Sequence, residues 1–136
     1  MAYKYSKSKP TVLGESAPMN VINTQLVSAS ILLADSKILN RTSISSSFYI
    51  NHSNYYIGVD TQNATGSVVV YLPRASGSVS GRTYTIKDES GNCNNNLIIV
   101  EPTNGNTIDG LNNVILDSPY ASLNVYTDGV SRWFIY

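Results

Sequence analysis

A length of 136 residues allows one domain with a modest core, since a chain of this size buries roughly two-thirds of the surface that its unfolded form exposes. Charged residues make up 13% of the chain and sum to a formal net charge of zero, which argues against a broad basic face for nucleic acid or an anionic membrane. Polarity comes instead from 15 Asn, 19 Ser and 10 Thr. The ten Tyr either pack on half-buried strand faces or form a contact surface for glycans or a protein partner.

Residues 1–24 are predicted to form an extended N-terminal arm. Lysines precede the first acid, Glu15, and Pro10, Gly14 and Pro18 interrupt any regular element. The arm is either a disordered tail or a tether that orders on a larger scaffold. The side chains proposed for attachment are Lys4, Tyr5, Lys7 and Lys9. Since neither a signal-peptide h-region nor an apolar run of roughly 20 residues occurs, we expect synthesis in a host cytoplasm without membrane insertion.

Residues 25–50 are predicted to form a connector or short stalk. An apolar stripe at helical spacing would suit a short helix or the start of a coiled coil: Ile22, Leu26, Ala29 and Leu33. Ser28, Ser30 and Ile31 are poor helix formers, so a strand or an extended segment is an equal alternative. Residues 43–47 are rich in serine and predict a connector into residues 48–50.

Strand signals then recur about every ten to twelve residues. They cover residues 55–59, 68–72, 83–87, 97–100, 114–116, 122–126 and 133–136. Turn-forming runs lie between them, namely DESGN at 88–92, TNGN at 103–106, and DG at 109–110 and 128–129. This spacing predicts an all-β head domain over residues 51–136, an antiparallel β-sandwich or barrel with little helix. On the last strand we expect Trp133 and Ile135 to face the core, because Arg132 lies on the opposite face.

Several of these motifs, taken in order, carry a resemblance to a known family. They are GRTYTIKD at residues 81–88, SGN at 90–92, NLII at 96–99, TIDG at 107–110, and YTDG at 126–129 with Trp133. This stretch, roughly residues 55–136, resembles a β-rich head or tip module of bacteriophage fibres and of large DNA virus spike and fibre proteins. The resemblance implies a homotrimer, a place in the virion, and a capsid or tail protein of the same virion as partner.

No residue constellation predicts catalysis, a metal or a cofactor. His52 is the only histidine, and Cys93 has neither a disulfide partner nor a neighbouring cation. Two acid pairs, Asp88 with Glu89 and Asp109 with Asp117, are interpreted as solvated turn acids. The loop from Asp88 begins like an EF-hand loop, but a Cys replaces its Gly and an Ile replaces its last Glu. We therefore expect a non-enzymatic protein.

Two functions remain open from the sequence. The first is a structural virion component, a surface fibre or spike head or a capsid-decorating protein, anchored by its N-terminal arm. The second is a receptor- or carbohydrate-binding tip, in which exposed aromatic rings stack on sugars and loop side chains bind hydroxyls. Its ligand candidates are Tyr55, Tyr56 and Tyr120.

Overall fold

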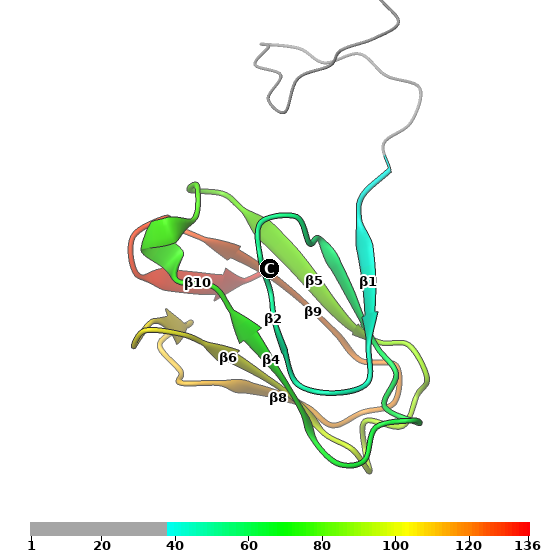
Figure 1. The fold of residues 1–136 in the computed structure, drawn as a ribbon. Helices are drawn as coiled ribbons and strands as arrows, with labels where there is room; N and C mark the ends of the chain where they lie inside the picture. Colours follow the sequence, from blue (N-terminus) through cyan, green and yellow to red (C-terminus); the bar gives the residue numbers. More distant parts are fainter. Residues whose placement is uncertain (1–37) are drawn as a thin grey trace, which may run out of the picture. The chain divides into compact units, whose positions relative to one another are not determined.

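The computed structural model describes residues 38–136, of which 42% lie in strands and 3% in helix, and this confirms the all-β class. The strands form two sheets in two layers (Figure 1). The six-stranded sheet has the order β1 (Arg41–Ile44), β3 (Tyr56–Val59), β5 (Thr83–Asp88), β9 (Ser122–Thr127), β10 (Arg132–Ile135) and β7 (Thr107–Ile108). The four-stranded sheet has the order β2 (Phe48–Tyr49), β4 (Val68–Leu72), β6 (Ile98–Pro102) and β8 (Val114–Leu116). A short 3-10 helix, η1 (Ala75–Gly77), follows β4.

The first six strands wind as a flattened coil. From β1 to β6 the chain alternates between the two sheets, so consecutive strands do not pair with each other. As a result β1, β3 and β5 run parallel in one sheet, and β2, β4 and β6 run parallel in the other. Antiparallel pairing begins later, where β8 adds to β6, β9 adds to β5, and β10 adds to β9.

The prediction of an antiparallel sandwich or barrel is therefore correct only as a sandwich. Within residues 38–136 five strand pairs are parallel and three are antiparallel, and each sheet ends in open edge strands. The spacing of strands and turns shows where each strand begins and ends. It does not show which sheet each strand joins, and that choice sets the strand direction.

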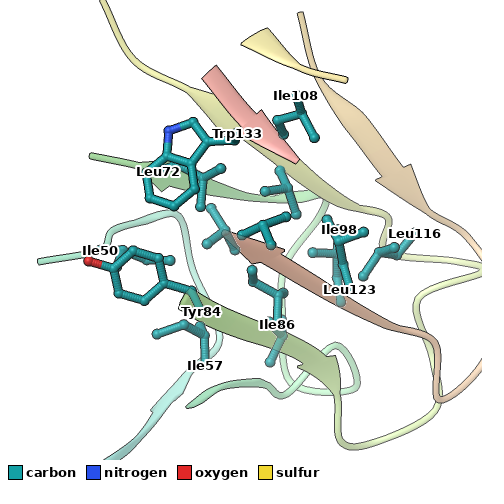
Figure 2. Packing of buried hydrophobic residues seen from close by; sticks show 14 of the residues in the cluster. Ile50, Ile57, Leu72, Tyr84, Ile86, Ile98, Ile108, Leu116, Leu123 and Trp133 are labelled. Carbon is teal, nitrogen blue, oxygen red and sulfur yellow. The ribbon is translucent and has the colours of Figure 1, made fainter. Parts of the chain in front are cut away.

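The apolar core lies between the two sheets (Figure 2). Alternate residues of β4 and β5 are buried and the others are partly exposed, as the period of two requires. Trp133 and Tyr84 are the largest fully buried side chains, and their ring centroids lie 5.6 Å apart. The predicted core position of Trp133 is confirmed, but Ile135 is 39% exposed, so its predicted burial is wrong. Ile135 lies near the end of β10, beyond the two residues that pair with β7.

Three strands, β1, β2 and β7, lie outside the ranges in which the sequence predicted strands. β1 overlaps the serine-rich segment interpreted as a connector, and β7 occupies the Thr107–Ile108 dipeptide. With β2, β1 also lies before residue 51, where the head domain was expected to begin. The expected strands elsewhere are present, including one over residues 114–116 with the predicted bounds. In the described part of the chain, no helix is long and apolar enough to cross a membrane.

Candidate functional site

A polar cleft lies on the outer face of the six-stranded sheet, between β1 and the loops that follow the carboxyl ends of β3 and β5. Its volume is about 420 Å³, within the range of ligand pockets in proteins. Here it is called the Asp60 cleft. Its lining consists of Arg41, Ser43, Asp60, Gln62, Asn63, Glu89 and Ser90. The side chains that line it are all polar or charged.

The floor of the Asp60 cleft depends on a glycine in the middle strand. Gly58 has no side chain, so the Glu89 carboxylate lies directly against it; a Cβ added at Gly58 would sit 2.2 Å from Glu89 Oε2. The Glu89 side chain, which follows the end of β5, therefore passes over β3 and reaches Arg41 on β1. Arg41 Nε donates to Glu89 Oε2 at 3.0 Å, and Arg41 Nη2 donates to Glu89 Oε1. The ion pair raises the pKa of Arg41 further above its usual value.

The loop after β3 forms one wall of the cleft and is held by its own hydrogen bonds. Asp60 accepts from the side-chain amide of Asn63 at 2.7 Å and from its backbone amide at 3.2 Å. These two bonds lower the pKa of Asp60, which keeps its carboxylate ionised at neutral pH. Ser90 Oγ accepts the backbone N–H of Gln62 at 2.9 Å and so joins this loop to the loop after β5.

Asp88 fixes the loops behind the cleft. Its side chain is fully buried and accepts from the Thr61 hydroxyl at 2.6 Å and from the backbone amides of Gly91, Cys93 and Tyr120 at 3.0–3.2 Å. Burial alone would raise the pKa of Asp88, but these bonds outweigh it and hold the pKa at about 2. The interpretation of Asp88 as a solvated turn acid is therefore wrong, because it is a buried anion that ties three loops together.

The cysteine and histidine singled out in the sequence lie apart from this lining. Cys93 is buried, its Sγ donates to the Ser118 carbonyl at 2.9 Å, and burial raises the pKa of the thiol to about 11. A thiol with that pKa is a poor nucleophile at neutral pH. His52 is exposed on the turn before β3, and its carbonyl accepts from Arg82.

The three tyrosines predicted as ligand contacts do not form one group. Tyr55 and Tyr56 contact each other edge to face, with ring centroids 4.8 Å apart, and Tyr56 is 41% exposed. Tyr56 lies in register with Arg41 on the outer face, beside the Asp60 cleft. Tyr120 precedes β9, and its ring lies over Gly91 and 5.9 Å from Lys87 Nζ. The predicted attachment residues Lys4, Tyr5, Lys7 and Lys9 lie outside the described residues.

The sequence reasoning missed the cleft, because its residues come from separate segments and the two that lie in a quoted motif, Glu89 and Ser90, were interpreted as turn residues. Arg41 and Glu89 are 48 positions apart and meet only because β1, β3 and β5 lie side by side. The one available signal was Gly58, a glycine inside a strand pattern, which often marks a close approach of another group. The lining offers hydrogen-bond donors and acceptors. Among residues 38–136 no group of three or more His, Cys, Asp or Glu could hold a metal ion.

The comparisons with family models and with curated proteins yield no relative. No family model matches the chain, and no curated protein matches it significantly. The assignment of function therefore depends on the fold and on the surfaces described above.

Proposed function

We propose that this protein is a non-enzymatic structural component of a virion, a fibre or spike head or a capsid-decorating protein that assembles as a homotrimer. The all-β sandwich and the resemblance of residues 55–136 to viral fibre modules support the proposal. The observation that carries the assembly is the outer face of the four-stranded sheet, which is mainly apolar although it lies opposite the core.

The outer face of the four-stranded sheet is built from two rows of side chains. Val69, Ile99 and Ile115 form one row in register across β4, β6 and β8, and Ile115 is 50% exposed. Tyr49, Tyr71 and Glu101 form the other row in register across β2, β4 and β6, and the rings of Tyr49 and Tyr71 are stacked with centroids 4.3 Å apart. The outer face of the six-stranded sheet is mixed. It carries polar pairs between β5 and β9, such as Thr85 with Asn124, and a separate aromatic cluster of Tyr126, Phe134 and Tyr136.

Exposed apolar side chains in one continuous patch mark an interaction surface, since removing them from water releases about 25 cal/mol per Å². Copies of the same chain are the partner that this proposal assigns to the patch. The N-terminal residues, with Lys4, Tyr5, Lys7 and Lys9, would then be the part that binds a capsid or tail protein of the same virion.

Native mass spectrometry of the full chain at micromolar concentration tests the assembly. We expect a trimer for the wild type and a monomer for Ile115→Glu, which places a charge within the apolar row. The matched control is Ser122→Glu, which adds the same charge on the outer face of the other sheet and should leave the trimer intact. A monomeric wild type, or a trimeric Ile115→Glu variant, would contradict the proposal. Copurification with virus particles tests the location.

The second candidate function is a receptor- or carbohydrate-binding tip. The specific observation that favours it is the Asp60 cleft, whose lining is polar and whose border carries the exposed ring of Tyr56. The two functions are compatible, because the cleft and the apolar face lie on different sheets.

A further inference from the structure

We infer that the Asp60 cleft is a binding site for a neutral carbohydrate, with a sugar ring seated among Arg41, Asp60 and Gln62. The inference rests on the second candidate function and gives it a place on the molecule and a ligand class. It does not depend on the oligomeric state or on a location in a virion.

The chemistry of the lining selects a ligand rich in hydroxyl groups. Small-molecule sites usually present mainly apolar walls with a few polar groups, whereas the side chains that line this cleft are all polar or charged. Gln62 and Asn63 each present an amide that can donate and accept, and both residues are exposed. A sugar hydroxyl donates and accepts at the same position, so it can satisfy both kinds of group.

The charges in the cleft select against an acidic ligand. One cation, Arg41, faces two carboxylates, Asp60 and Glu89, and the guanidinium already bonds to Glu89 through two of its nitrogens. The remaining charge is that of Asp60, which would repel a phosphate, a sulfate or the carboxylate of an acidic sugar. The same carboxylate accepts strong hydrogen bonds from the hydroxyls of a neutral sugar.

The cleft is ordered before any ligand arrives. Ser90 bonds the amide of Gln62, Asn63 bonds Asp60, and the intervening Thr61 is bonded to the buried carboxylate of Asp88. A wall held in this way loses little conformational freedom on binding, which matters for a ligand that offers few contacts. Tyr56 lies beside the cleft with a partly exposed ring, where it can cover the apolar face of a sugar.

Amide chemical-shift mapping on the ¹⁵N-labelled full chain tests the inference. The probes are D-glucose, D-galactose and N-acetyl-D-glucosamine, with N-acetylneuraminic acid and inorganic phosphate as anionic controls. We expect at least one neutral sugar to shift the amides of Gln62, Asn63 and Ser90 saturably, and the anions to leave them unchanged. No response to any neutral sugar, a stronger response to an anion, or shifts centred on the separate aromatic cluster of Tyr126 and Phe134 would overturn the inference.

Two variants locate the binding within the cleft. Asp60→Asn keeps the size of the side chain but removes its charge. It should weaken the binding of the sugar about tenfold, which is the loss expected for one charge-assisted hydrogen bond. Gln62→Ala should weaken it several-fold, since Gln62 is exposed and its described hydrogen bond uses only the backbone. Asp117→Asn, which removes an exposed charge outside the cleft, should bind like the wild type. Unchanged affinity in Asp60→Asn, with a native amide spectrum, would overturn the site.

The outcome is separable from the assembly proposal. Ile115→Glu should lose the trimer and keep the sugar response, because its substitution lies on the other sheet. Asp60→Asn should keep the trimer and weaken the sugar response. A wild type that forms trimers and responds to no sugar would remove this inference while leaving the structural function in place.

Discussion

Asp88 contributes more to the fold than its sequence context indicates, because its side chain holds several loops together. It sits in an Asp-Glu-Ser-Gly-Asn run that reads as an exposed turn, yet it is fully buried and bonded by four donors. Burying an ionised carboxylate without hydrogen-bond partners costs a large amount of folding free energy. Four donors compensate the Asp88 carboxylate for this loss of water, and the bonds hold in place the loops that supply the donors.

Asp88→Asn should lower the free energy of unfolding by about 2–4 kcal/mol. The NH2 group of the asparagine replaces one carboxylate oxygen and cannot accept from the two donors that this oxygen binds, so two of the four hydrogen bonds are lost. Urea denaturation followed by tyrosine and tryptophan fluorescence measures this change. Asp117→Asn is the matched control and should stay within about 0.5 kcal/mol of the wild type, since Asp117 is exposed. Equal stability of the two variants would show that the Asp88 network contributes nothing.

The same carboxylate predicts the acid sensitivity of the protein. The pKa of Asp88 is about 2 in the folded state and 3.8 without the fold, so the folded state favours the ionised form. The resulting stability is complete above the unfolded pKa and is lost as pH falls from about 4 toward 2. Asp128, with a pKa also near 2, contributes in the same window. Unfolding curves measured from pH 6 to pH 2 should therefore fall less steeply for Asp88→Asn than for the wild type.

Trp133 is a packing residue whose polar atom has no partner. The side chain is fully buried against Tyr84, and its Nε1 makes no hydrogen bond within the described structure. Trp133→Ala should cost about 3–5 kcal/mol, the usual range for truncating a buried Trp. Trp133→Phe should cost clearly less, because it keeps an aromatic ring and removes the unpaired donor. Thermal denaturation measures the stability of the two variants. A Phe variant as unstable as the Ala variant would point to an unrecognised partner of Nε1.

At the scale of elements, the side-by-side packing of β1, β3 and β5 is what turns separate polar residues into a cleft. Gly58 on the middle strand leaves room for Glu89 to reach Arg41 across it. A strand interior normally disfavours glycine, so the residue is explained by this crossing and not by the strand itself.

Gly58→Ala should therefore separate local structure from stability. The added Cβ would overlap the Glu89 carboxylate, which is the mobile end of a long side chain and can move aside. The lost contact is an exposed ion pair, so the free energy of unfolding should change by less than about 1 kcal/mol. The Arg41 Nε–H resonance should nevertheless shift as the ion pair opens. An unchanged Arg41 resonance would mean that Glu89 does not need the glycine.

At the scale of the whole molecule, the proposals divide the chain into an anchoring part and an assembling part. Deleting residues 1–20 should leave the β-sandwich folded and trimeric, since the apolar face of the four-stranded sheet lies outside the deleted residues. The same deletion should abolish incorporation into virus particles. Native mass spectrometry and particle copurification measure the two effects separately. A truncated chain that still enters particles would refute the anchoring role of the arm.

The sequence by itself determined the all-β class, most strand positions and the burial of Trp133. These features depend on a local signal, the alternation of apolar residues between turn-forming runs. Successive side chains of a strand point to opposite faces, so the apolar ones face the core whichever sheet the strand joins. Strand β1 was not predicted, because apolar and polar residues alternate only weakly over Arg41 to Ile44. The strand depends on its pairing with β3.

Only the tertiary structure decided the path of the chain and the place of the cleft. Alternation between sheets makes β1, β3 and β5 parallel neighbours, and it brings Arg41 beside Glu89 from 48 positions away. It also determined that Asp88 is buried, because its donors come from three separate loops. Contacts between residues far apart in the chain leave no periodic trace in the sequence, since each partner satisfies its own local pattern and the pairing is set by how the strands pack.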